Sequence, residues 1–233
     1  MKPFFSYYGA KYIGAKYYGK PRRDLVIEPF AGSACYATRW NARNVRLYDV
    51  SPDICDLWDF LINASVNDIE KIPDSFVTDE EFLSLERGPR LLCSFWIAKG
   101  RAQPSQKLSP WYFRYNQSHD CRVWGPQVKA RIINQKPLIA NWTVDQLSWE
   151  KVPVEEAHWH IDPPYSGAPG RKYPHDSVDF PALAEWCRSL PGSVDVCENV
   201  GADWLPFDPL FEVVSTRGRR EGSYSSEAVW RKI

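Results

Sequence analysis

Asp162-Pro163-Pro164-Tyr165 is the segment of this sequence whose residue types best suit a chemical reaction. The carboxylate of Asp162 and the backbone carbonyl of Pro163 can both accept hydrogen bonds from one amino group. Such bonds draw a conjugated nitrogen toward tetrahedral geometry and free its lone pair. The proline rings restrict φ, so that the two acceptors converge, and Tyr165 offers a flat face on which an extruded base can stack. The segment predicts methylation of an exocyclic amino group, with a Pro-Pro turn capped by the aspartate as the alternative.

A second group of candidate residues lies in 28–34 and at Asp49. The small residues around Gly32 allow the backbone to approach a ligand closely, and a helix N-terminus is predicted behind them. Asp49 follows about 20 residues later, at the end of the next predicted strand, where an acidic residue can accept both hydroxyls of a ribose. The pair favours a nucleoside site. The alternatives are an ordinary turn glycine and a helix-capping aspartate.

The elements that must position these residues alternate between strands and helices. Apolar runs predict strands at 25–27, 45–49, 159–162 and 193–197, and a closing hairpin of 211–215 with 227–230. Helices are predicted from Cys35 to Ala42, from Pro52 onward, where Ser51-Pro52-Asp53 resembles a helix start, and from Phe180 to Leu190. Strand–helix–strand order predicts an α/β fold with a parallel sheet.

Residues 87–136 interrupt this pattern with aromatic and basic side chains. They hold ten Lys and Arg residues and one acidic residue, Asp120, in a chain whose net charge is zero. Residues 1–23 hold six further basic residues and no acidic one. Positive charge concentrated in two blocks predicts a polyanion-binding face, with a merely solvated surface as the alternative.

Other function classes find little support in the sequence. No run of 18 apolar residues exists, and the N-terminus lacks a secretory signal, so we expect a cytoplasmic protein that does not span a membrane. The six cysteines show no CxxC spacing, which predicts free thiols and neither zinc nor disulfides. No Pro-Cys dipeptide occurs, so a nucleophilic-cysteine route to cytosine C5 is unsupported.

Several segments together resemble the Dam-type DNA adenine methyltransferases. The likeness covers most of the chain in the family's α-group order, and the tetrapeptide at Asp162 matches fully. The segments are 3–11 (the opening motif), 28–34 (the cofactor loop), 48–53 (the ribose segment), 162–165, 197–199 and 227–230. Departures are Ser6 for a lysine, Tyr7 for a tryptophan, Ala10 and Ala34 for glycines, and Asn141 for an acidic residue that supports the cofactor's adenine.

The resemblance implies a Rossmann-like methyltransferase fold. This is a three-layer α/β sandwich with a mostly parallel seven-stranded sheet and an antiparallel closing strand. Residues 1–65 and 141–233 are expected to form the catalytic, S-adenosylmethionine-binding domain. Residues 66–140 are expected to form an inserted, mainly helical target-recognition subdomain.

The resemblance also implies roles for individual residues. The catalytic group is Asp162, Pro163, Pro164 and Tyr165. The cofactor-binding group is Tyr7, Lys11, Glu28, Phe30, Gly32, Asp49 and Asp162, and no metal is expected. The DNA-binding group is Arg101, Lys107, Arg114, Asn116, Arg171 and Lys172, because cations neutralise phosphates and Arg or Asn reads base edges. Residues 166–172, after the catalytic turn, suit a loop that closes over a flipped base.

The expected activity is direct in-line transfer of a methyl group to adenine N6 of double-stranded DNA, by a monomer of phage or bacterial origin, after base flipping. Cytosine-N4 methylation needs the same acceptors and stays open. Methylation of RNA or of a protein amide and a DNA-binding homologue that has lost catalysis are further alternatives. A nucleotide-dependent dehydrogenase would leave the tetrapeptide unexplained.

Overall fold

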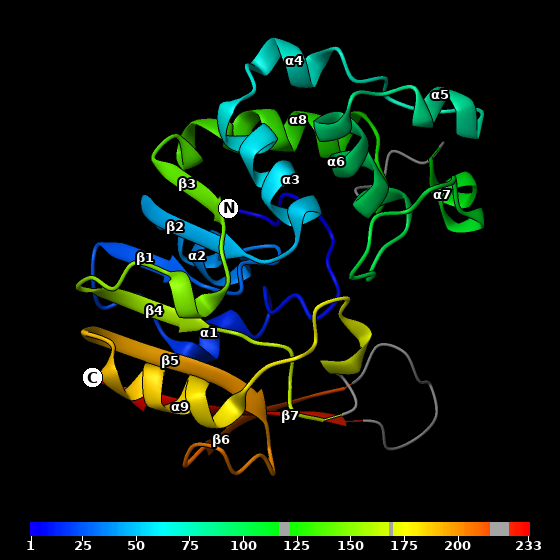
Figure 1. Cartoon of the computed structure of the whole chain (residues 1–233). Helices are drawn as coiled ribbons and strands as arrows, with labels where there is room; N and C mark the ends of the chain where they lie inside the picture. The colour runs from blue at the N-terminus through cyan, green and yellow to red at the C-terminus, as the bar shows by residue number, and fades with distance from the viewer. Residues whose placement is uncertain (117–121, 168–169, 215–223) are drawn as a thin grey trace.

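A mixed seven-stranded sheet forms the centre of the protein. The structure is a computed structural model and describes residues 1–116, 122–167, 170–214 and 224–233. The strand order is β3-β2-β1-β4-β5-β7-β6 (Figure 1). The strands are β1 (Leu25–Glu28), β2 (Asn44–Asp49), β3 (Trp142–Gln146), β4 (Ala157–Ile161), β5 (Gly192–Asn199), β6 (Asp208–Val214) and β7 (Tyr224–Lys232).

Strand direction and order create the edge at which the candidate residues lie. Strands β1 to β5 pair in parallel, whereas β7 pairs antiparallel with both β5 and β6. The chain passes outward from β1 to β3 and then returns to β4 on the other side of β1, so the order reverses between β1 and β4. Ligands of open α/β sheets bind beside the carboxyl ends of strands at such a reversal. The predicted α/β fold with a mostly parallel seven-stranded sheet and an antiparallel closing strand is confirmed.

Helices cover both faces of the sheet. Alternate residues of a strand point to opposite faces, and Val26 accordingly belongs to one apolar cluster while Ile27 belongs to another. The first cluster takes in α1 (Ala15–Tyr18), α2 (Cys35–Trp40) and α3 (Pro52–Asn63). The second takes in α9 (Phe180–Ser189) and the short helix η2 (Trp149–Lys151).

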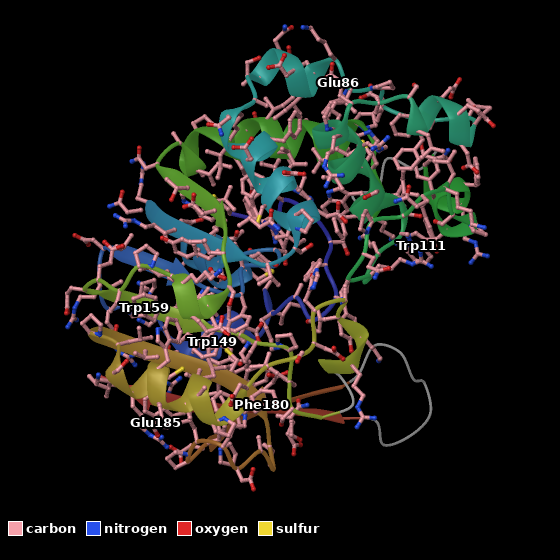
Figure 2. All side chains as sticks on the ribbon, in the orientation of Figure 1. Glu86, Trp111, Trp149, Trp159, Phe180 and Glu185 are labelled. Carbon is pink, nitrogen blue, oxygen red and sulfur yellow. The ribbon has the colours of Figure 1, made fainter. Side chains whose placement is uncertain are left out.

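Tryptophans join α9 and η2 to the sheet in the second cluster. Trp149 and Trp159, labelled in Figure 2, contact the Trp186 ring of α9 at centroid distances of 5.4 and 5.6 Å. These large side chains bury enough apolar area to fix α9 against the sheet. The two clusters and the sheet between them give the expected three layers.

Residues 66–140 are mainly helical where they are described. The helices are α4 (Val66–Glu70), α5 (Asp79–Leu83), α6 (Arg87–Ile97), α7 (Pro110–Tyr115), α8 (Pro126–Gln135) and η1 (Lys136–Ile139). They gather beside the β3 end of the sheet (Figure 1). Their core is continuous with that of α3 through the opening segment. The Phe5 ring contacts Phe95 of α6 at 5.3 Å and Trp58 of α3 at 5.5 Å between centroids, and Trp96 Nε1 donates to the Phe4 carbonyl at 2.9 Å.

The predicted elements agree closely with the observed ones, although β3 and the short helices α1 and η2 were not predicted. The structure confirms the predicted strands β1, β2, β4 and β5 and the predicted helices α2, α3 and α9. It also confirms the antiparallel pairing of β6 with β7. Ser215, the last residue of the predicted strand, lies outside the described residues. Helix α2 ends at Trp40, earlier than predicted, because Asn41 is left-handed at φ +52°. Strand β3 was not predicted from an apolar run. No helix of the described residues is long and apolar enough to cross a membrane.

Candidate functional site

A pocket opens at the carboxyl edge of β1, β2 and β4, where the order of the strands reverses. The space inside it is about 700 Å³, part of which is open solvent. Its wall brings together three separated parts of the sequence: the opening segment, the two loops after β1 and β2, and the chain after β4. The lining includes the predicted residues Tyr7, Lys11, Glu28, Phe30, Gly32, Asp49, Asp162 and Pro164.

Backbone N–H groups hold the carboxylate of Asp49. Its Oδ2 accepts from Gly32 N at 3.0 Å and its Oδ1 accepts from Ser51 N at 2.9 Å. Burial raises the pKa of this carboxyl, and the two N–H donors counteract part of that rise. A carboxylate offers about four lone-pair positions, so Asp49 keeps acceptor capacity for a hydroxyl group of a ligand.

The loop between β1 and α2 has a turn that favours glycine. Gly32 and Ala34 are both left-handed, at φ +45° and +44°. A Cβ atom at position 32 would lie 3.1 Å from the Tyr7 ring, which would have to shift slightly, and the positive φ adds strain, so both features favour glycine there. The carbonyl of Gly32 accepts from Trp58 Nε1 at 2.8 Å, which fixes the turn against α3.

Glu28 lies at the floor of this loop. Its side chain is buried, and its Oε1 accepts from Ala37 N at 2.8 Å in the first turn of α2. Burial raises the pKa of Glu28 to about 8, the Ala37 N–H lowers it, and the nearby charge of Asp162 raises it. Glu28 is therefore mostly protonated at neutral pH while it caps α2.

The carboxylate of Asp162 reaches the pocket from the end of β4. Its side chain is 26% exposed, so it points neither into the core nor away from the cavity. Its Oδ1 accepts from Lys11 Nζ at 3.3 Å. The pKa of Asp162 is raised by burial, lowered by the Lys11 ammonium and raised again by the Glu227 carboxylate, and the net direction is upward.

Lys11 connects Asp162 to two other side chains. Its Nζ lies 3.7 Å from Glu227 Oε2 and 4.3 Å from the centre of the Tyr165 ring. Burial alone would lower the pKa of Lys11, but the carboxylates of Asp162 and Glu227 raise it by more, so the net direction is upward. The lysine is therefore a fixed ammonium inside the site.

The rest of the tetrapeptide is arranged around this ammonium. Pro163 is buried and Pro164 lines the pocket. The Tyr165 hydroxyl donates to Glu227 Oε2 at 2.6 Å, which fixes the orientation of the ring. The Ser166 N–H donates to Glu198 Oε2 at 3.0 Å.

Several lining residues were not predicted from the sequence. Tyr173 and His175 enter the pocket from the chain after η3 (Gly170–Lys172), and Tyr173 donates to the Tyr8 carbonyl at 3.2 Å. His160 borders the pocket and stacks on Tyr36 at 4.1 Å, and burial lowers its pKa. An aromatic residue in a loop gives no local pattern, although Tyr173 lies close to the predicted loop 166–172. Residues 168–169 of that loop lie outside the described residues.

The predicted DNA-binding residues lie on the surface in two places. Arg101, Lys107 and Arg114 are exposed in the helical segment, and Asn116 follows α7 half-buried. Arg171 and Lys172 are exposed in η3, where Lys172 Nζ lies 5.1 Å from the centre of the Tyr8 ring. On α7, Trp111, labelled in Figure 2, is 39% exposed and Phe113 is 50% exposed. The other large aromatics Trp96, Tyr112 and Trp124 are buried, so core packing explains these three.

Comparison with known proteins gives structural likenesses only. No protein-family model and no curated protein sequence matches the chain. Among solved structures it is similar to the 23S rRNA methyltransferase ErmE, with a TM-score of 0.40 over 94% of this chain and 65% of that one. It is also similar to the putative methyltransferase yhhF from Escherichia coli (TM-score 0.36, 89% and 75%) and to the putative methylase HI0767 from Haemophilus influenzae (TM-score 0.34, 93% and 82%).

Identity is 9% in all three comparisons, and the chain spans less than two thirds of the length of ErmE. Likeness at this level carries no information about substrate. Inference about activity therefore depends on the geometry of the pocket.

Proposed function

We propose that the protein is an S-adenosylmethionine-dependent methyltransferase that acts on adenine N6 in double-stranded DNA. One observation carries the proposal: Asp49 and Asp162, predicted to bind a ribose and an amino group, line the same pocket at the carboxyl edge of the sheet. A nucleoside site and an amino-group site in one cavity are what transfer from a nucleoside cofactor to a base requires.

The residues on the Asp49 side suit this cofactor. The remaining acceptor capacity of Asp49 suits a ribose hydroxyl, and the Gly32 turn keeps the backbone close to the pocket. Phe30 and Tyr7 supply apolar surface on the same wall. When bound, S-adenosylmethionine supplies an activated methyl group on a positively charged sulfur.

The residues on the Asp162 side suit an amino-group acceptor. The ionised carboxylate accepts a hydrogen bond from the amino group, and the backbone carbonyl of Pro163 is proposed as the second acceptor. Once nitrogen has received the methyl group it must lose a proton, and Asp162 is the carboxylate placed in the pocket to receive it. The ammonium of Lys11 holds Asp162 in position while leaving its other oxygen available.

Double-stranded DNA is proposed as the substrate because of the cations beside the pocket and the exposed aromatic residues of the helical segment. Arg171 and Lys172 lie in the segment that leads to the lining residue Tyr173. The exposed Trp111, Phe113 and Arg114 of α7 offer stacking faces and a base-reading or phosphate-binding cation. An adenine amino group is inside a duplex, so the base must be extruded to reach Asp162.

The test uses DNA from cells that express the wild-type chain or D162A. Long-read sequencing should detect N6-methyladenine at a defined sequence for the wild type and none for D162A. Purified D162A should retain DNA affinity, because the substitution removes only the carboxylate. Methyl transfer by D162A would contradict the mechanism. Digestion of the DNA to nucleosides distinguishes N6-methyladenine from N4-methylcytosine, and binding without transfer by the wild type would indicate an inactive homologue.

A further inference from the structure

Two tyrosine rings, here called the tyrosine wall, form one side of the pocket. Tyr7 comes from the opening segment and Tyr173 from the chain after η3, and both line the pocket. Their ring centroids are 6.1 Å apart, so the two rings contact each other and form a continuous surface. Burial raises the pKa of the Tyr173 hydroxyl. The carboxylates of Asp162 and Asp49 raise this pKa too, whereas the Lys11 ammonium lowers it, and the net direction is upward. The phenol is therefore neutral and lies within electrostatic reach of both carboxylates.

The position of Tyr173 is fixed by segments that are distant in sequence. Its hydroxyl donates to the Tyr8 carbonyl at 3.2 Å. The N–H of Tyr8 donates in turn to the Arg101 carbonyl at 3.1 Å, which ties the opening segment to the helical segment. Gly9, at φ +71°, leaves room for the phenol, since a Cβ atom there would lie 2.1 Å from Tyr173 Oη. These contacts hold the ring by its hydroxyl end, so the ring itself stays along the pocket.

Cations of the protein lie over the neighbouring tyrosine rings but not over the tyrosine wall. Lys11 Nζ lies 4.3 Å from the centre of the Tyr165 ring, and Lys172 Nζ lies 5.1 Å from the centre of the Tyr8 ring. Across the residues that the structure describes, no lysine or arginine makes such a contact with either ring of the wall. An aromatic ring attracts a cation within about 6 Å of its centre. The wall can therefore attract a cation that belongs to a ligand.

We propose that the tyrosine wall contacts the positive sulfur of the methyl donor, and that Tyr173 thereby makes the pocket prefer the donor to the product left after transfer. This inference rests on the proposed function and assigns a ligand contact to a residue outside the predicted site. The donor's sulfur is bonded to its ribose group, and the methyl group on that sulfur must reach an amino group at Asp162. A donor whose ribose binds Asp49 therefore has its sulfur between the two carboxylates, beside the wall. The product, S-adenosylhomocysteine, has a neutral thioether there and gains no such attraction.

The test measures dissociation constants of two ligands by calorimetry, with no turnover. One is S-adenosylhomocysteine. The other is sinefungin, an analogue with the same adenosine and amino-acid parts and a protonated amine in place of the sulfonium centre. Y173L removes the ring and keeps an apolar side chain. We expect it to reduce the preference for sinefungin over S-adenosylhomocysteine roughly three- to tenfold, the size of one cation–π contact. Y173F keeps the ring, so it should keep most of the preference.

A fluorinated ring separates electrostatic attraction from packing. Phenylalanine with five ring fluorines, incorporated at position 173, keeps nearly the shape of the Y173F side chain, but the fluorines withdraw electron density from the ring face. Relative to Y173F, its preference for sinefungin should fall toward that of Y173L. Y17L is the matched control, because Tyr17 is exposed on α1 and is not among the residues that line the pocket, so the preference should stay unchanged. If Y173L does not fold, the comparison of the two ring forms still tests the proposal.

The outcomes separate this inference from the proposed function. If the wild type binds both ligands and Y173L weakens both equally, Tyr173 has only a packing role and the inference is wrong while the function stands. A preference that fluorination of the ring leaves unchanged contradicts the inference in the same way. If the wild type binds neither ligand, the proposed function itself is wrong and the inference fails with it.

Discussion

The two halves of the pocket hold their carboxylates in different ways. On the β1–β2 side, Asp49 is held by backbone N–H groups of Gly32 and Ser51. On the β4–β7 side, Asp162 is held by the side chain of Lys11, which also contacts Glu227. Backbone donors keep a fixed dipole, whereas side-chain ions bring a full charge that depends on pH and can be removed by one substitution.

This difference indicates a division of labour. The backbone-held half is suited to neutral hydroxyl groups, whose recognition depends on direction and distance. The ion-held half is suited to a step in which charge moves, because buried charges act strongly when water is excluded. Substitutions in the two halves should therefore affect different quantities: binding on one side and rate on the other.

The largest expected effect is on the rate, from D162N. The amide keeps the size of the side chain but cannot take up a proton, so we expect methyl transfer to fall by roughly 10²–10³-fold, as when other charge-stabilising groups are removed. Affinity for S-adenosylhomocysteine, which carries no positive sulfur, should change little. Single-turnover transfer and equilibrium binding, measured on the same sample, give the two values. A large loss of binding with normal turnover would assign Asp162 to the other half.

The wild-type rate should also decline in acid at a higher pH than an exposed aspartate would cause. Burial raises the pKa of Asp162, so its ionised, active form is lost earlier as pH falls. K11M removes the ammonium that favours ionisation and should move this decline further upward in pH. A decline that moves downward in K11M would contradict the assignment. The rate profile from pH 5 to 9 measures both.

The next largest effect concerns stability and involves Glu28. Its pKa rises from 4.5 to about 8 on folding, mainly through burial. A raised pKa gives stability that is complete below the unfolded value and is lost as pH rises through the folded value. E28Q stays neutral at every pH. Its free energy of unfolding relative to that of the wild type should therefore increase by on the order of 3 kcal/mol as pH rises from 5 to 9.

Urea unfolding of both proteins at each pH measures the difference. Burial lowers the pKa of His158 to about 4, so this residue also makes the free energy of unfolding depend on pH, in the opposite direction. Because His158 is present in both proteins, comparing E28Q with the wild type at equal pH cancels its contribution. A difference that stays constant with pH would show that Glu28 does not change its ionisation on folding.

A smaller effect is expected for cofactor binding in D49N. The amide can accept only one of the two backbone N–H groups and places its own N–H₂ against the other, so affinity should fall by about tenfold or more. Turnover at saturating cofactor should stay near that of the wild type. D53N is the matched control, since Asp53 pairs with Arg87 on the surface of α3. An equal loss in both variants would mean that the effect is not local to the pocket.

The smallest expected effect is on DNA affinity in R114A. Loss of one phosphate contact should weaken binding by a few-fold and reduce the slope of log K against log salt by about 0.9. If Arg114 reads a base, the loss should instead depend on the DNA sequence. K151A is the control, because Lys151 is exposed in η2 on the opposite face from the helical segment.

Sequence reasoning predicted the two halves of the pocket unequally. The Asp49 half depends on neighbours along the chain, such as Gly32 and Ser51, and a short motif reveals it. In the other half, Lys11 meets Asp162 across 151 residues and Tyr165 meets Glu227 across 62. Such partners become visible only after the sheet order has brought β7 next to β5.

Strand β3 was not predicted from the sequence for a similar reason. Trp142–Gln146 is a short edge strand with one fully buried side chain, Trp142, and mostly exposed or half-buried residues after it. It therefore lacks the apolar run that revealed β1 and β4. Pairing with β2 in parallel, and not its own composition, makes this segment a strand.

Ala34 shows that the left-handed turn after Gly32 forms without a glycine at this position. The residue is left-handed at φ +44°, the conformation that glycine adopts at no steric expense. Alanine in this conformation costs about 1–2 kcal/mol of strain. It also lowers the conformational entropy of the unfolded chain, which stabilises the folded state by about 0.4–1 kcal/mol relative to glycine. The strain is the larger contribution, so A34G should make the protein more stable by on the order of 1 kcal/mol. The turn nevertheless forms with alanine at position 34, so a search pattern that insists on glycine there would overlook chains folded like this one.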